Sequence, residues 1–185
     1  MQTPKLFMLM LGCTPPGRNT EQHDIFFSLA ETVKDMVPEI KAFWPEAKDK
    51  IHIDAWREVT QVNGHRITVV PKAQAAEAAD KLFFLNLGGY KPGEFDEFHY
   101  KMLAVAPDTA GAVKQAKQTA FYKHTGFKGA TSHIDDKFGV DVDDIYKVED
   151  ILPEAVKQKY SLQVTKTDST AEDDLHLGYF QLHKL

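Results

Sequence analysis

Two stretches of the chain repeat the same pattern of apolar and polar positions. Residues 5–24, beginning KLFMLMLG, and residues 81–100, beginning KLFFLNLG, share ten identities over twenty positions, where unrelated segments would share about one or two. Each stretch opens with a short apolar run that ends at glycine and then at a Pro-Gly pair, which is typical of a buried strand entering a loop. A second apolar segment follows each loop, so each copy predicts a hairpin with a long connection. The pattern therefore predicts an internal duplication with an offset of 76 residues.

The duplication continues into a helix and a further strand. Helical spacing of apolar residues follows Thr32 in the first copy and Asp108 in the second, and both of these residues are suited to cap a helix. Pro38 favours a helix that begins there or is kinked there. Residues 50–59 alternate as in a strand, with one predicted face formed by Ile51, Ile53 and Ala55 and the other by His52, Asp54 and Trp56. The triplet His-Ile-Asp of this strand recurs at residues 133–135.

The remaining segments complete each copy and add a tail. Asn63-Gly64 predicts a hairpin turn into residues 66–70, and the second copy has strand-like segments at 132–140 and 145–151. Two further strand-like segments, 160–167 and 176–182, are joined by a polar loop and predict a hairpin. We therefore expect an α+β fold of two pseudo-symmetric ββαββ-like repeats packed as one body. The predicted boundaries are 1–71 and 81–153 for the repeats, 72–80 for an alanine-rich, helical connector, and 154–185 for the C-terminal hairpin.

Composition narrows the classes of function. Apolar residues make up 43% of the chain and aromatic residues 11%, enough to form a core. The formal charge is −5 with lysine and arginine scattered, so the chain lacks the basic patch that binding to nucleic acid or an anionic membrane requires. No apolar run approaches the roughly 20 residues that span a bilayer. Cys13 is the single cysteine, which excludes an internal disulfide and fits a reducing, cytoplasmic compartment. The remaining partners are a small molecule, another protein or a second copy of the chain.

The second copy carries a recognisable signature. Its Leu-Gly-Gly-x-x-Pro-Gly loop at 87–93 is followed by Glu97-x-His99, an alternating strand that ends in Val-Ala, and a lysine-bearing helix. This arrangement resembles the bacterial domain of unknown function 1543 family, whose members carry one or two such units. The resemblance covers residues 5–153, and the first copy departs from it at Cys13 and at Ser-Leu-Ala over 28–30. It implies a bacterial source and no particular activity.

Two Glu-x-His pairs are candidates for catalytic work. Glu21 and His23 are two positions apart on a predicted strand and share a face, as do Glu97 and His99. A carboxylate beside an imidazole can orient a proton, act in acid–base chemistry or share a metal ion. Alternatively, each pair is structural and its side chains bond the backbone of the adjacent loop.

Two other sets of residues are candidates for binding. His52 and Asp54, with His133 and Asp135, could supply ligands to zinc or a similar divalent ion if they converge with the Glu-x-His pairs. An exposed polar face explains the same pattern without a metal. The loop glycines could offer backbone N–H groups to an anion, or serve only the geometry of a turn; the ligand-binding candidates here are Gly88, Gly89, Tyr90 and Gly93.

These observations favour a non-enzymatic module that binds a small ligand or a protein at a site between the two repeats. The alternative is a small acid–base or metal-dependent enzyme that uses the Glu/His and His/Asp pairs. The sequence leaves open which of the two it is and identifies no cofactor beyond the candidate divalent metal.

Overall fold

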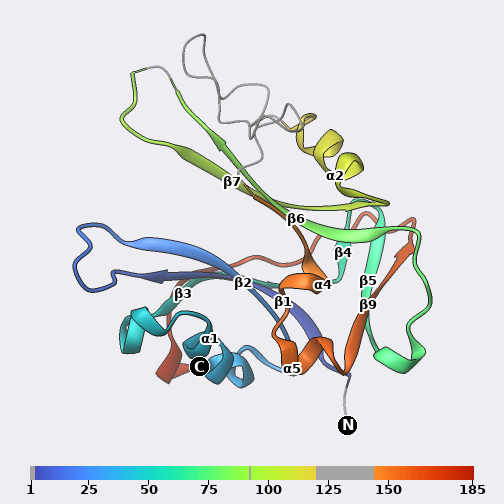
Figure 1. The fold of residues 1–185 in the computed structure, drawn as a ribbon, viewed down its shortest axis with the longest axis horizontal. Coiled ribbons are helices and arrows are strands. Elements are labelled where there is room, and N and C mark those ends of the chain that lie inside the picture. The colour runs from blue at the N-terminus through green and yellow to red at the C-terminus, as the bar shows by residue number, and fades with distance from the viewer. Residues whose placement is uncertain (1–2, 92, 120–143) are drawn as a thin grey trace. The chain divides into compact units, whose positions relative to one another are not determined.

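The chain has an α+β fold of antiparallel strands and short helices. The computed structural model describes residues 3–91, 93–119 and 144–185 (Figure 1). It divides into two compact units, which are described separately below. Unit 1 consists of Met1–Ala76 together with Ile151–Leu185, and unit 2 is Glu77–Asp150.

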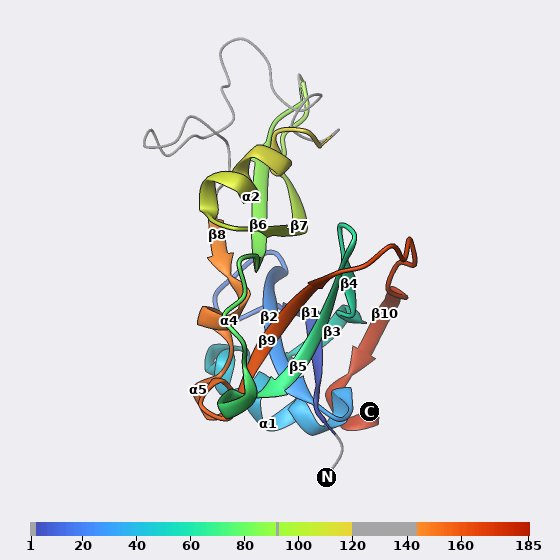
Figure 2. The same cartoon turned by 90° about the vertical axis from the view of Figure 1, so that its right-hand side faces the viewer.

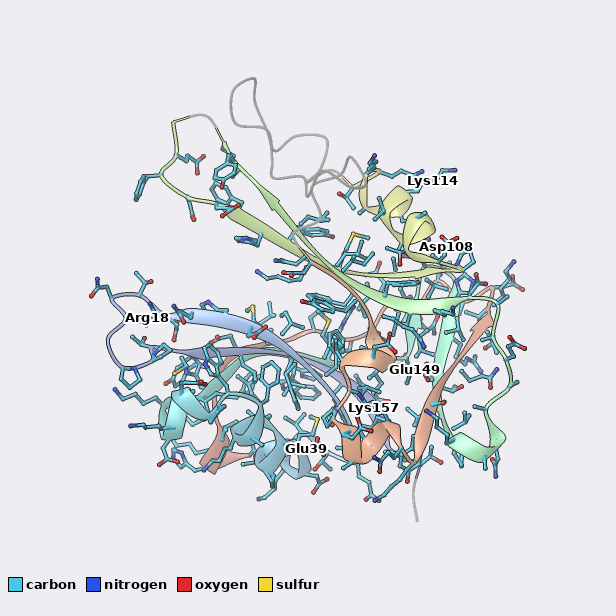
Figure 3. The ribbon with its side chains drawn as sticks, viewed as in Figure 1. Arg18, Glu39, Asp108, Lys114, Glu149 and Lys157 are labelled. Atoms are coloured by element: carbon cyan, nitrogen blue, oxygen red, sulfur yellow. The ribbon has the colours of Figure 1, made fainter. Side chains whose placement is uncertain are left out.

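The main sheet of unit 1 has four strands in the order β10-β3-β1-β2. The strands are β1 (Lys5–Cys13), β2 (Gln22–Ala30), β3 (His52–Glu58) and β10 (His176–Gln181). The predicted hairpin is present, because β1 and β2 pair along their whole length from Lys5 opposite Ala30 to Cys13 opposite Gln22. Its connecting loop carries Arg18, which marks the outer end of the hairpin (Figure 3).

Short helices cover one face of this sheet (Figure 1). They are η1 (Val33–Met36), α1 (Val37–Phe43) and η2 (Pro45–Lys50). Thr32 precedes η1 as predicted, and its backbone N–H donates to the Asp35 carboxylate at 2.9 Å. Pro38 lies in the first turn of α1, where its missing N–H costs no helical hydrogen bond. Between helices and sheet lies the core, which includes Leu9, Leu11, Cys13, Met36, Ile40 and Ile53, all completely buried.

A bulge in β3 changes which side chains face this core. Leu11 pairs with Ile53 and Met10 pairs with Ala55, so Asp54 is an extra residue in β3. Beyond the bulge the alternation of faces is reversed. The expectation that Ala55 shares the face of Ile53 is therefore wrong: Trp56 packs against the core instead.

A second sheet of unit 1 has the order β4-β5-β9. It contains β4 (Gln61–Val62), β5 (His65–Pro71) and β9 (Tyr160–Lys166), and Figure 2 shows β5 and β9 side by side. The predicted Asn63-Gly64 turn is present, with φ of 50° and 72°, the left-handed conformation that a tight hairpin needs.

The C-terminal hairpin predicted over 154–185 does not form. β9 pairs with β5 of the second sheet, and β10 pairs with β3 of the main sheet. The reason is that β5 and β3 each offer an edge with unpaired backbone groups, and separate pairing satisfies both edges. Three further short helices flank these strands in the sequence: η3 (Lys72–Gln74), α5 (Glu154–Lys157) and η4 (Leu182–Lys184).

Unit 2 has one three-stranded sheet in the order β7-β6-β8. Its elements are β6 (Lys81–Gly89), β7 (Phe98–Ala106), α2 (Thr109–Ala116), β8 (Asp144–Lys147) and α4 (Val148–Ile151). The expected cap is confirmed, since the Asp108 carboxylate accepts the Gly111 N–H at 2.8 Å. The strand expected over 145–151 ends at Lys147, and its second half is α4.

The two hairpins pair in equivalent registers. Lys81 faces Ala106 as Lys5 faces Ala30, and Gly88 faces His99 as Gly12 faces His23. The third strands differ from the alignment of the two His-Ile-Asp triplets, which are 81 residues apart. Glu58 pairs with Phe7, and Lys147 pairs with the equivalent Phe83. By strand pairing, Glu58 and Lys147 are therefore equivalent, and they are 89 residues apart in the sequence. The triplet at 133–135 lies outside the described residues.

The connector over 72–80 is mostly not helical. Only η3 forms, and the boundary between the two units falls after Ala76. Proline at 71 sets the start of η3, but three residues give too few hydrogen bonds to propagate a helix.

Candidate functional site

The site begins at Gly12, close to the end of β1. Gly12 faces His23 of β2 on one side and His52 of β3 on the other. The bulge adds Asp54 next to this point, and Glu21 directly precedes β2. Three strands thus bring the first-copy candidates Glu21, His23, His52 and Asp54 together over Gly12, which confirms that the two pairs converge in unit 1.

These four side chains form a closed ring of contacts, called here the His–carboxylate ring. His52 Nε2 lies 3.1 Å from Glu21 Oε1 and 3.2 Å from Asp54 Oδ1. His23 Nε2 lies 3.2 Å from Asp54 Oδ2 and 3.6 Å from Glu21 Oε2. Each imidazole therefore contacts both carboxylates, and each carboxylate contacts both imidazoles.

The four side chains of the ring differ in exposure, with His52 and Asp54 the less exposed pair and His23 and Glu21 the more exposed pair. The side chain of His52 is 5% exposed and that of Asp54 is 21% exposed, whereas His23 and Glu21 are 39% and 44% exposed. His52 Nε2 and Asp54 Oδ2 are buried, and neither makes a well-aligned hydrogen bond to the residues that the structure describes. Buried polar atoms without aligned partners are costly, so the ring is a candidate functional site.

The second ring nitrogen of His52 faces a backbone oxygen. Nδ1 lies 3.4 Å from the Lys50 carbonyl. A neutral imidazole carries one N–H, so with a proton on Nδ1 its Nε2 lone pair faces the oxygens of Glu21 and Asp54. With the proton on Nε2, the Nδ1 lone pair faces the carbonyl. Each tautomer of a neutral His52 therefore satisfies only one side of its environment.

Glycine at position 12 leaves the space that the ring occupies. A Cβ at this position would lie 2.5 Å from His52 Nε2 and would also overlap Asp54 Oδ2. Any other residue at position 12 would displace the two buried members of the ring.

A pocket of about 530 Å³ opens beside the ring. Its wall includes Glu21 and His52 from the ring, and the Tyr179 ring lies 4.2 Å from the His52 imidazole. The volume is in the range of small-molecule sites. The other lining residues are Thr14, Lys41, Asp49, Lys50, Ile51, Gln181, Leu182 and His183.

The charges around the pocket are only partly compensated. Lys41 pairs with Asp49 at 3.2 Å, and Glu21 contacts His52. Lys50 has no ion pair with any acidic side chain in the described part of the chain. Burial raises the pKa of the Cys13 thiol, and the positive charge of Lys50 acts in the opposite direction. The pocket therefore offers Lys50 as a cation to a ligand.

The structure describes only some of the second-copy candidates. His99 is exposed and Glu97 is partly buried, and Tyr90 lies at the end of β6. Gly88 and Gly89 are the last two residues of β6. His133 and Asp135 lie outside the described residues. The convergence of the two kinds of pair is thus described for unit 1 alone.

The loop glycines behave as turn residues. Gly17 and Gly93 occupy equivalent positions and have φ of 78° and 79°, and nothing lies within 4 Å of a Cβ built at either one. Both sites need glycine for the left-handed backbone, in agreement with the turn interpretation.

Two surveys of the described residues bear on the site. Among residues 3–91, 93–119 and 144–185, no group of three or more His, Cys, Asp and Glu side chains could hold a metal ion. Among the same residues, no helix has the length and apolar character needed to cross a bilayer.

Sequence reasoning missed three contributors to the site. Gly12 was assigned to the strand-to-loop transition, Lys50 to the start of a strand, and Tyr179 to a C-terminal hairpin. The register of β1 against its two neighbours is the information that would have identified Gly12, because only that register places a glycine between two histidines.

Comparisons with known proteins show a shared fold and a family match over part of the chain. The chain is similar in structure to protein Il1583 from Idiomarina loihiensis, with a TM-score of 0.62 and 23% identity over 97% of this chain and 98% of that one. This likeness shows a shared fold. A search of curated proteins found no match. The family described as a Domain of Unknown Function (DUF1543) matches residues 18–69, a span that contains the whole His–carboxylate ring. Residues 18–69 of the chain are therefore similar to the DUF1543 family.

Proposed function

We propose that this chain is a cytoplasmic bacterial binding protein whose unit 1 takes up a small anionic ligand in the pocket beside His52. The observation that carries the proposal is the pocket itself, with its 530 Å³ volume and its uncompensated Lys50. This proposal moves the site expected between the repeats into unit 1.

The lining of the pocket supports a small, polar ligand. Tyr179 and His52 offer ring surfaces that are tilted at 35° to each other, and Thr14 and Gln181 offer hydrogen-bonding groups. Lys50 offers a positive charge that can recognise a carboxylate or phosphate. A pocket built mainly of polar side chains favours a metabolite over an apolar ligand.

The test is a thermal-unfolding screen with inorganic phosphate, succinate and a nucleoside monophosphate. A ligand at 100 times its dissociation constant stabilises the native state by about 2.7 kcal/mol. For a chain of this size, that corresponds to a rise in Tm of roughly 5–10 °C. Sodium chloride at matched ionic strength separates binding from general salt effects.

Lys50→Ala and Lys114→Ala form a matched pair of variants. Both remove one exposed lysine, but Lys114 is on α2 of unit 2 (Figure 3). We expect Lys50→Ala to abolish the ligand-induced shift and Lys114→Ala to keep it. Equal shifts in the two variants, or no shift with any anion in the unmodified protein, would contradict the proposal.

The contacts of His52 favour acid–base catalysis as a second candidate function. His52 borders the pocket and contacts both Glu21 and Asp54, an arrangement that can accept and return a proton. Incubation of the protein with a bacterial metabolite extract, followed by mass spectrometry, would show consumption of a compound. A catalyst loses this activity in His52→Asn, whereas a binding protein consumes nothing.

A further inference from the structure

We propose that strand β10 of unit 1 is the surface through which two copies of this chain form a two-fold symmetric dimer, by antiparallel pairing of β10 with β10 of the second copy. This surface differs from the ligand pocket, because Leu175 and Leu177 do not line that pocket. The proposal rests on the free edge of β10, on its exposed apolar side chains and on the charges at its two ends.

Strand β10 has one side available for pairing. It is an end strand of the main sheet (Figure 2). One side pairs with β3, and none of the strands in the ranges 3–91, 93–119 and 144–185 pairs with the other side. The backbone N–H and C=O groups of such an edge can form hydrogen bonds with a strand of another chain.

The sequence of β10 lacks the charged side chains that keep the edges of sheets apart. Natural sheets protect their edges with charges, with proline or with very short strands. Residues 175–182, LHLGYFQL, contain no Asp, Glu, Lys, Arg or Pro. Among the other end strands, β4 has only two residues, and the charged residues of β2, β7, β8 and β9 include Asp24, Lys101, Asp144 and Lys166 in that order. In the part of the chain that the structure describes, β10 is thus the end strand without such protection.

Large apolar side chains are exposed along this edge. Leu175 is 65% exposed, Leu177 72% and Tyr179 63%. Leu177 and Tyr179 are two positions apart in β10 and therefore lie on the same side of the strand, with Leu175 a further two positions before them. Exposed apolar side chains that are grouped in this way mark an interaction surface. Two-fold pairing would place the two groups side by side and remove both from water.

The irregular part of β10 fits a two-fold axis at the middle of the strand. β10 forms a bulge against β3 between Leu177 and Phe180, and Gly178 within it has φ of 149°. In an antiparallel dimer centred on Gly178 or Tyr179, this irregular backbone lies at the axis in both copies. The same centring sets Leu177 opposite Tyr179 of the second copy or two positions from it, where large side chains on paired strands contact each other.

The charges at the two ends of β10 select a second copy in the reversed orientation. Asp174 precedes the strand and Lys184 follows it, and both are exposed and form no ion pair with a described residue. Antiparallel pairing centred on Tyr179 places Asp174 opposite Lys184 of the second copy, and pairing centred on Gly178 places it two positions away. The two-fold axis repeats this pair of opposite charges, so the interface is self-complementary.

The experiment is sedimentation equilibrium of the full chain over a wide range of protein concentration. We expect a monomer of 20.9 kDa at low concentration and a dimer of twice that mass at high concentration. Leu177→Lys puts a charge into the interface from both copies, so it should raise the dissociation constant of the dimer at least about tenfold. Phe95→Lys is the matched control, because it makes the same kind of change at an exposed apolar residue between β6 and β7.

Two further sets of variants test the location and the orientation. Asp174→Lys and Lys184→Asp should each weaken the dimer, and the double variant should restore it, because the opposite charges then face each other again. A short bismaleimide should join two copies of Tyr179→Cys. It should join neither Phe95→Cys nor the unmodified chain, in which Cys13 is buried.

The outcomes are distinct. A dimer that Leu177→Lys weakens and Phe95→Lys leaves intact, with cross-linking of Tyr179→Cys, supports the interface. A monomer at every concentration overturns it and leaves the edge of β10 to a different partner. Equal effects of Leu177→Lys and Phe95→Lys, or a double charge reversal that restores nothing, also overturn it. Failure of the anion screen leaves this result standing, because neither Leu177 nor Asp174 lines the pocket.

Discussion

Replacement of Gly12 by alanine is the most direct test of how the site is built. The added Cβ would lie 2.5 Å from His52 Nε2, where ordinary contact begins at 3.4 Å. His52 must then move by about 0.9 Å, and Asp54 must move as well. Because His52 is buried and held between Gly12 and Tyr179, it cannot simply rotate into solvent.

The expected cost follows from overpacking. Insertion of a methyl group into a well-packed site typically costs about 1–3 kcal/mol. In a chain of this size each kcal/mol lowers Tm by roughly 2–4 °C. We therefore expect Gly12→Ala to lower Tm by roughly 2–12 °C and to weaken binding of the pocket ligand.

The measurement is thermal unfolding by circular dichroism, with and without the anions of the ligand screen. Gly17→Ala is the control: it strains a left-handed residue with nothing within 4 Å, so it lowers stability but leaves the ring intact. If Gly12→Ala is as stable as the unmodified protein and binds equally well, the packing argument is wrong.

Three further predictions concern other parts of the chain. Asp173→Ala should cost about 1–3 kcal/mol in denaturant unfolding because it removes the acceptor of the Thr60 N–H and hydroxyl, whereas Asp174→Ala, at an exposed neighbouring position, should change little. Burial raises the pKa of Cys13, so at pH 8 its thiol should react with a thiol reagent more than about tenfold more slowly in native than in unfolded protein; equal rates would contradict this. Burial acts to lower the pKa of Lys147, but hydrogen bonds and charges of Glu149 and Asp150 raise it overall. The folded state therefore holds this proton more tightly than the unfolded state. The resulting stabilisation is complete below the ordinary pKa of 10.5 and is lost as pH rises through the higher pKa of the folded state. In Lys147→Met, the free energy of unfolding should lack this loss at alkaline pH.

The local patterns of the sequence were sufficient to predict the two repeated hairpins, the caps and the Asn63-Gly64 turn. Each depends on a few neighbouring residues, such as the Thr32–Asp35 pair or the left-handed Asn63. The convergence of Glu21-x-His23 with His52-x-Asp54 also followed from the repeated spacing, once β1 was found between β2 and β3.

The features that the sequence did not predict depend on pairing between strands that are far apart in the chain, and hydrophobic periodicity gives no information on that pairing. A bulge at Asp54 exchanged the faces of Ala55 and Trp56, because one extra residue reverses every later position in a strand. The β9 and β10 segments are compatible with a hairpin, yet each pairs with a different sheet. The contributions of Gly12 and Tyr179 could not be found without those registers.

The discontinuity of unit 1 has a consequence for synthesis of the protein on the ribosome. Strands β3 and β5 emerge early, but their partners β10 and β9 follow only after the whole of unit 2 has been translated. During that interval two hydrogen-bonding edges are open to other nascent chains. Elongation speed and chaperone supply should therefore govern the soluble yield, and a fragment truncated before residue 160 should aggregate.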